Sequence, residues 1–115
     1  MRNDKDNLIV NLTFKFALDV IEYCETLESQ KKYVLARQLL KSGTSIGANT
    51  REAQNAESKA DFIHKFKVAA KEADETEYWL SLCKESKNYP DPGNLLEELD
   101  VIIKIISKII SSSKG

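Results

Sequence analysis

The sequence predicts an all-α protein, an up-down-up-down antiparallel four-helix bundle formed by a single domain over residues 1–115. Three observations predict this fold. Only four glycines and two prolines occur in 115 residues, so long segments lack helix breakers. Apolar residues within these segments recur with the helical period. The breaks between segments are short, and short connections make sequential helices antiparallel.

The first helix is expected over residues 7–28, and its apolar residues form two stripes. One stripe contains Val10, Phe14, Ala17, Leu18, Ile21 and Cys24. The other, on the far side, contains Ile9, Leu12, Phe16, Val20, Tyr23 and Leu27. A helix needs an apolar arc of only about 100° to cover its own core. Because monomers rarely expose such a surplus, the far stripe is predicted to form a subunit interface through Ile9, Leu12, Phe16, Val20 and Leu27.

The second helix is expected over residues 33–55, and it contains Gly43 and Gly47 four positions apart on one face. Each glycine inside a helix costs about 1 kcal/mol relative to alanine, so a compensating contact is expected. Close packing against a neighbouring helix is the main interpretation, and backbone approach to a ligand is the alternative. Asn49 lies at the margin of the apolar stripe and, if buried, needs a hydrogen bond to helix backbone or across an interface.

The third helix is expected over residues 58–87, with Ser58 as its N-cap and Asp61 at the capping-box distance. Its core stripe contains Phe62, Phe66, Ala69, Ala70, Ala73, Leu80 and Cys83. Trp79 lies outside this stripe with Val68 and Leu82, which predicts packing in a subunit interface. Stacking of Trp79 on a nucleic-acid base is the alternative, although acidic residues surround it.

The fourth helix is expected over residues 92–111, because Asp91 and Pro92 suit the N-cap and the first helical position. Its core arc contains Leu95, Leu96, Leu99, Ile102, Ile103, Ile106, Ile109 and Ile110. Val101 and Ile105 widen this arc, so they are also predicted to belong to the subunit interface.

The composition disfavours a membrane or secreted protein. No segment approaches the roughly 20 apolar residues that span a bilayer, and no signal-peptide hydrophobic region follows the polar start of the sequence. Cys24 and Cys83 lie outside any paired motif and are expected to be reduced core residues. A cytoplasmic protein without membrane contact is therefore expected.

Catalysis is not expected, and neither a cofactor, a metal nor a small-molecule substrate is evident. Carboxylate-bridged metal sites in four-helix bundles use paired Glu-x-x-His motifs, but the sequence has one histidine, His64. A Ser or Cys nucleophile needs a histidine base within reach, and His64 is predicted on a solvent face. A metal-dependent or hydrolytic bundle enzyme is the alternative function.

The total of 17 Lys and Arg against 18 Asp and Glu conceals a polarised chain. Residues 31–71 carry nine basic and three acidic side chains, whereas residues 72–100 carry two basic and nine acidic ones. An up-down bundle gathers both termini and the connection between its second and third helices at one end, which is then basic. The alternative is a solvated face with intrahelical pairs such as Asp61 with Lys65. The candidate nucleic-acid or partner contacts at this end are Arg51, Lys59, Lys65, Lys67, Lys104 and Lys108.

Three runs of sequence resemble a known family in their order and spacing: SIGANTREA at residues 45–53, SKADF at 58–62 and AKEADETEYWL at 70–80. The family is that of the bacterial 23S ribosomal RNA intervening-sequence proteins, and the resemblance covers nearly the whole chain. It implies a homopentamer of four-helix bundles and offers no catalytic residues to carry over. Some members are encoded within inserts in large-subunit ribosomal RNA genes.

A related branch contains the accessory proteins of diversity-generating retroelements, pentameric barrels whose implied partners are a reverse transcriptase and nucleic acid. Those proteins are strongly basic, whereas this chain has a pI of about 5.9. The function predicted here is a non-enzymatic, ring-shaped homo-oligomer. As an adaptor, it would bind RNA or an RNA-handling enzyme, such as a reverse transcriptase, through its basic end.

Overall fold

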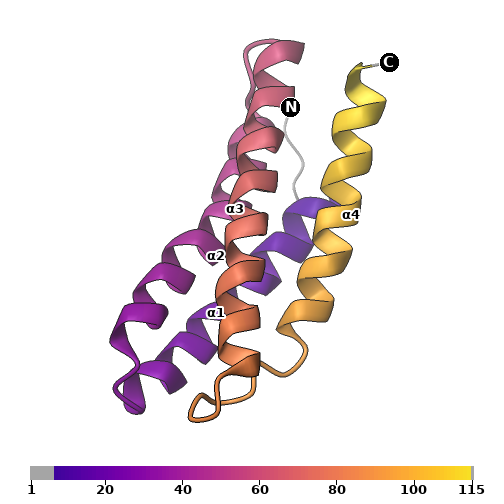
Figure 1. The fold of residues 1–115 in the computed structure, drawn as a ribbon. Coiled ribbons are helices and arrows are strands. Elements are labelled where there is room, and N and C mark those ends of the chain that lie inside the picture. Colours follow the sequence, from indigo (N-terminus) through magenta and orange to yellow (C-terminus); the bar gives the residue numbers. More distant parts are fainter. Residues whose placement is uncertain (1–6, 115) are drawn as a thin grey trace.

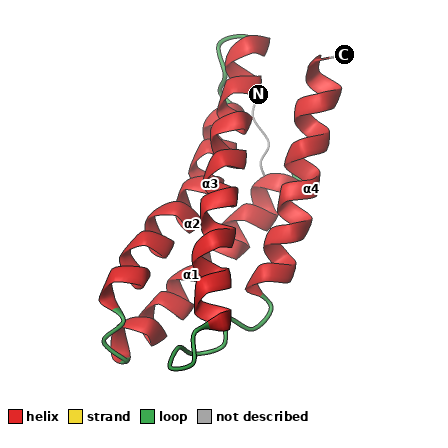
Figure 2. Cartoon of the chain, in the orientation of Figure 1, coloured by secondary structure: helices red, strands yellow, loops and turns green. Residues whose placement is uncertain are grey.

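The computed structural model describes residues 7–114, which form four helices joined by short connections (Figures 1 and 2). The helices are α1 (Leu8–Ser29), α2 (Tyr33–Ala53), α3 (Lys59–Glu85) and α4 (Leu95–Lys114). Consecutive helices pack side by side, and α4 returns to pack against α1. The connection between α2 and α3 lies at the same end of the bundle as the end of α4 (Figure 1). The predicted all-α, up-down-up-down four-helix bundle is confirmed.

The turn between α1 and α2 ends the first helix with a Schellman motif built without glycine. The amide of Lys32 donates to the carbonyl of Leu27 at 2.8 Å, and the amide of Lys31 donates to that of Glu28 at 2.9 Å. Lys31 adopts the left-handed conformation with φ 62°, which this motif requires and which usually selects glycine. The turn therefore lies where the sequence predicts a break.

The start of α3 follows the predicted capping pattern. Ser58 is extended, and its Oγ accepts a hydrogen bond from the amide of Asp61 at 3.0 Å. The Asp61 carboxylate accepts from the amide of Glu57 at 3.2 Å. The first bond satisfies an amide that the first turn of a helix leaves unpaired, and the second bond joins the residue before the N-cap to that turn.

The start of α4 differs from the prediction, because the helix begins at Leu95 rather than at residue 92. Asp91 Oδ1 accepts from the amide of Gly93 at 3.2 Å, so the expected capping residue forms a local turn instead. Gly93 then takes a left-handed φ of 61°, a conformation available to glycine at little cost. Because of this turn, α4 begins three residues later than predicted.

Most residues of the two α1 stripes show the opposite burial to the one predicted. Ile9, Phe16, Val20 and Leu27 are at most 5% exposed within the single chain, so the interface assigned to them is wrong. Leu12 is half-buried against the core. In the other stripe Phe14 is 55%, Leu18 52% and Ile21 40% exposed, whereas its two end members, Val10 and Cys24, are buried. Both stripes have the helical period, so periodicity alone does not identify the inner one.

The core stripes of α3 and α4 follow the predictions. Phe66, Ala69, Ala73, Leu80 and Cys83 are buried on α3, and Leu95, Leu99, Ile102 and Ile106 are buried on α4. At the two α4 positions assigned to a subunit interface, Val101 is 48% exposed and Ile105 is half-buried against the core.

Candidate functional site

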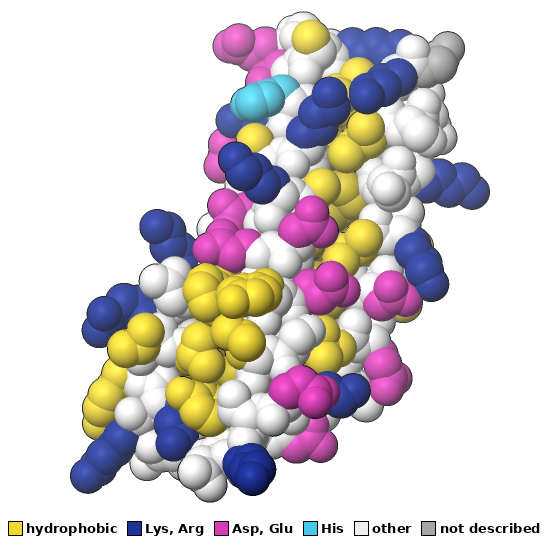
Figure 3. Space-filling model, in the orientation of Figure 1, with side chains coloured by type: hydrophobic (Ala, Val, Ile, Leu, Met, Phe, Trp, Pro, Cys, Tyr) yellow, Lys and Arg dark blue, Asp and Glu magenta, His cyan; other side chains and the backbone are white. Residues whose placement is uncertain are grey.

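The end of the bundle where α2 meets α3 presents the candidate cations. Arg51 lies in the last turn of α2 and Lys59 at the start of α3. Lys65 and Lys67 follow on α3, Lys104 lies at the middle of α4, and Lys108 lies in its second half. Lys and Arg side chains gather at this end of α3 and α4 in Figure 3, with acidic side chains beside them. The fold therefore brings cations from three helices to one end.

Three of the six candidate cations already have partners within the chain. Lys65 Nζ lies 3.0 Å from Glu52 Oε1, and this hydrogen bond raises the pKa of Lys65. Lys104 Nζ lies 2.9 Å from Asp100 Oδ2. The guanidinium of Arg51 lies 5.8 Å from the centre of the Phe14 ring, within cation–π range. The expected pair between Asp61 and Lys65 is not formed, because Lys65 reaches across to α2.

The other three candidates are Lys59, Lys67 and Lys108, which are exposed and form no ion pair with any residue in the range 7–114. Their ammonium groups are free to contact an anion. Glu52, Glu57 and Asp61 lie near the same end, and Glu52 is largely neutralised by Lys65. Among the residues named here, four cations without an ion pair in the described part of the chain, namely Arg51, Lys59, Lys67 and Lys108, stand against the two carboxylates Glu57 and Asp61.

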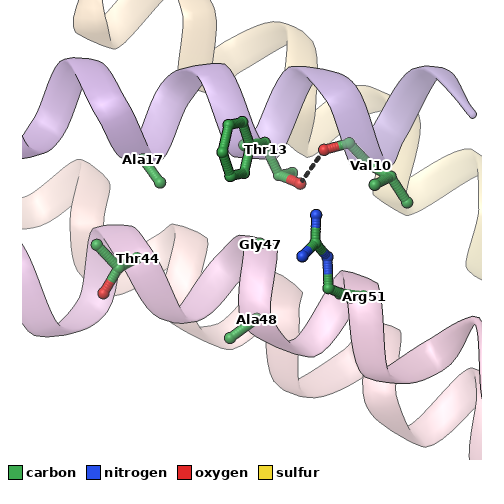
Figure 4. Close-up of a pocket in the computed structure, with 8 residues that line it drawn as sticks. Val10, Thr13, Ala17, Thr44, Gly47, Ala48 and Arg51 are labelled. Carbon is green, nitrogen blue, oxygen red and sulfur yellow. Dashed lines mark hydrogen bonds between the residues drawn. The ribbon is translucent and has the colours of Figure 1, made fainter. Parts of the chain in front are cut away.

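The outer face between α1 and α2 contains a groove of about 280 Å³. Thr13, Ala17, Gly47 and Ala48 give it small walls, and Phe14 stands on one margin. Figure 4 shows the Arg51 side chain extending from α2 toward α1 near Val10 and Thr13. The full lining is Val10, Thr13, Phe14, Ala17, Thr44, Gly47, Ala48 and Arg51. The groove is thus mainly apolar, with one cation at its end.

The two glycines of α2 lie where α1 comes closest. A Cβ added to Gly43 would lie 2.9 Å from Val20 Cγ1, and one added to Gly47 would lie 3.3 Å from the carbonyl oxygen of Thr13. This is the helix contact expected at these positions, with α1 as the neighbour. Asn49 Nδ2 donates to the backbone carbonyl of Ser45 at 2.9 Å, so the amide is satisfied within its own helix.

The groove is absent from the sequence-based expectations, because Phe14 and Ala17 belong there to an apolar stripe with no assigned role. The small residues of the second helix could have indicated the groove. Gly47 and Ala48 are adjacent small residues, and Gly43 shares a face with Gly47. Where two helices cross closely at small residues, few side-chain atoms fill the outer surface between them. A groove is therefore expected on that surface.

The remaining polar clusters offer no catalytic arrangement among residues 7–114. His64 is exposed, and the two free cysteines are buried. Burial raises the pKa of Cys24 to about 12, which disfavours the thiolate that a nucleophile requires. In this part of the chain no three His, Cys, Asp or Glu side chains form a group that could hold a metal ion. None of the described helices is long and apolar enough to cross a membrane.

Lys15 connects α1 to α4 near a second, more polar groove. Its Nζ lies 2.6 Å from Asp19 Oδ2 and 3.2 Å from Glu98 Oε1. The hydrogen bond from Lys15 lowers the pKa of Asp19, whereas partial burial raises that of Glu98. The carboxylates thus already have a partner, and we interpret the cluster as a contact that holds the two helices together.

Comparison with known proteins places this architecture among related chains. Residues 5–112 match the profile of the family described as 23S rRNA-intervening sequence protein. A similar solved structure, at 1.70 Å resolution, is a protein of unknown function from the S23 ribosomal protein family of Bacteroides thetaiotaomicron. It is 39% identical with a TM-score of 0.84, over 89% of this chain and 97% of that one. No curated protein matches the chain at significant similarity.

Proposed function

Because the chain belongs to the 23S rRNA-intervening sequence protein family, we propose that it is a non-enzymatic, cytoplasmic RNA-binding protein. In this proposal identical subunits assemble into a ring, with five copies as the family resemblance implies. The ring serves as an adaptor that holds the phosphate backbone of RNA. The contact is made at the end of the bundle where α2 meets α3.

The observation that carries this proposal is the set of three unpaired lysines at that end. Lys59, Lys67 and Lys108 come from two helices, are exposed, and have no ion pair among the described residues. Flexible ammonium groups bind phosphates as point charges and carry no base specificity. In a cyclic assembly the same group of lysines repeats around the ring, which increases the attraction for a polyanion.

The test is a fluorescence-anisotropy titration of labelled single-stranded RNA with the wild-type protein at low and moderate salt. Binding should weaken as salt rises, because lysines that bind phosphates release counterions. The triple variant K59A/K67A/K108A should bind more weakly. The slope of its log affinity against log salt should also be shallower, by about 0.7 for each phosphate that the substituted lysines no longer neutralise.

The matched control is K31A/K84A/K87A, which removes three exposed lysines at the opposite end of the bundle. Its affinity for RNA should stay within about twofold of the wild type. Absence of binding by the wild type at low salt contradicts the proposal. Equal reductions of affinity in the two triple variants contradict the assignment to this end.

A further inference from the structure

We propose that the groove between α1 and α2 is one half of a head-to-tail interface, and that a second copy of this chain fills it with Tyr78 and Trp79 of its α3. This inference rests on the self-assembly in the proposed function and adds the two surfaces that meet. It does not depend on RNA binding.

The groove face carries more exposed apolar area than a solitary bundle helix needs. Phe14, Leu18 and Ile21 of α1 are 40% exposed or more, and so is Leu40 of α2. They continue along the same outer face as the groove of about 280 Å³. Contiguous apolar patches on a monomer usually mark interaction sites. Concave walls of small residues suit a bulky projecting side chain.

The complementary feature is an aromatic pair on α3, in which the Tyr78 ring projects and Trp79 lies half-buried against the core. Tyr78 is 59% exposed, and its ring packs edge-on against Trp79 with the ring centres 5.2 Å apart. Hydrophobic side chains gather on the face seen in Figure 3, toward the end of the bundle that holds the α1–α2 turn. Tyrosine and tryptophan are enriched among the residues that dominate binding energy in interfaces.

The hydrogen-bonding groups of the two surfaces also complement each other. Tyr78 is 59% exposed and carries a phenolic hydroxyl, which can donate a hydrogen bond to a second copy. Thr44 lines the groove, and its hydroxyl donates to the carbonyl of Leu40 at 2.7 Å. The lone pairs of that hydroxyl stay available to the incoming Tyr78 O–H.

Charges around the two surfaces have opposite signs. Arg37, Lys41 and Arg51 are exposed along the α2 side of the groove, with Glu25 of α1 as an exception. Asp74 and Glu75 lie one turn before Tyr78, and Glu85 lies two turns after it, with Lys71 as the exception. Such charges at the rim of an interface steer association and set its register more than they add affinity.

The two surfaces lie on different sides of the bundle, so the contact is heterologous. Each subunit then offers a groove to one neighbour and an aromatic pair to the other. A heterologous contact repeats around an axis and forms a ring when the rotation closes. The inferred pair of surfaces therefore agrees with a cyclic assembly and not with a two-fold dimer.

The experiment uses two variants that each block one surface. Ala48→Glu places a carboxylate in the groove, and Tyr78→Glu removes the projecting ring; both positions are exposed, so the fold should persist. Each variant alone should sediment as a monomer of about 13.0 kDa. Mixed in equal amounts, they should form a 1:1 heterodimer and nothing larger, because only one intact groove and one intact aromatic pair remain.

The control is Ser107→Glu on α4, an exposed position outside both surfaces, which should assemble as the wild type does. Circular dichroism must show native helicity in all three variants. This inference is overturned if both blocking variants still assemble as the wild type does, or if their mixture stays monomeric. Either result leaves the RNA proposal standing. A monomeric wild type overturns both the inference and the proposed ring.

Discussion

Gly43 and Gly47 determine how closely α1 approaches α2. The backbone of α1 lies against Gly47, and the Val20 side chain lies against Gly43. Alanine is favoured over glycine by about 1 kcal/mol inside a helix, so glycine is retained here at a cost to helix propensity. The packing of the two helices outweighs that cost.

Gly43→Ala should therefore destabilise the protein despite its better helix propensity. The new methyl would lie 2.9 Å from Val20 Cγ1, and valine has few alternative rotamers in a helix. Overpacking costs about 1–3 kcal/mol, which exceeds the propensity gain. The measurement is the free energy of unfolding in urea, in a double-mutant cycle with Val20→Ala.

In the Val20→Ala background the same glycine substitution should be neutral or stabilising, because the conflicting methyl groups are gone. A coupling energy of at least about 1 kcal/mol is expected between the two positions, as for residues that touch. Additive effects of the two substitutions would contradict the proposed clash.

The burial of three threonines could not be predicted from the sequence residue by residue. Thr13, Thr50 and Thr76 are at most 1% exposed, although a hydroxyl argues for the surface. Each hydroxyl donates to the carbonyl four residues earlier, at 2.7–2.8 Å, and Thr76 also lies 2.9 Å from Ser42 Oγ. Satisfied in this way, threonine packs in the core much as valine does.

At the level of elements, the sequence predicts helices better than it predicts their faces. Each of the four helices was expected, and the Ser58 cap is present. The start of α4 was missed, because a capping aspartate and a turn-forming aspartate have the same local sequence. Most positions on the two faces of α1 have the reverse of the expected burial, because the inner face is selected by packing against α2 and α4. Such packing involves residues distant in sequence.

The reversed faces of α1 lead to a direct comparison of two substitutions. Phe16→Ala should lower the free energy of unfolding by about 3–5 kcal/mol, since it empties a fully buried position. Leu18→Ala should change it by less than about 0.5 kcal/mol, because Leu18 is half exposed within the chain. Both are measured by urea unfolding at concentrations where the chain is monomeric. Similar decreases at the two positions would contradict the orientation of α1.

For the whole molecule, the distribution of charge was predictable because it needs only helix order and direction. Alternating helices bring the end of α2, the start of α3 and the end of α4 together, whatever the details of packing. Which cations are free was not predictable. Lys65 pairs with Glu52, 13 positions away, and such a pair depends on the relative rotation of two helices.

Stability should be uneven along α4. Ile106 is the last buried residue of this helix, and residues 107–114 contain no buried side chain. Segments with few buried side chains open at low free energy. In hydrogen–deuterium exchange followed by mass spectrometry, residues 107–114 should exchange well before residues 66–80 of α3. Equal protection of the two segments would contradict this expectation.

The close crossing at Gly47 also limits how this surface can diverge between related proteins. Part of the groove wall is the backbone of α1 and α2, and backbone offers no side chain for mutation to alter. At the inferred contact, new partner preference can therefore arise only at positions whose side chains line the groove, such as Phe14, Ala48 and Arg51. Under the inferred head-to-tail contact, differences at those positions would keep two related proteins in one cell from assembling together, while the helix crossing beneath them stayed the same.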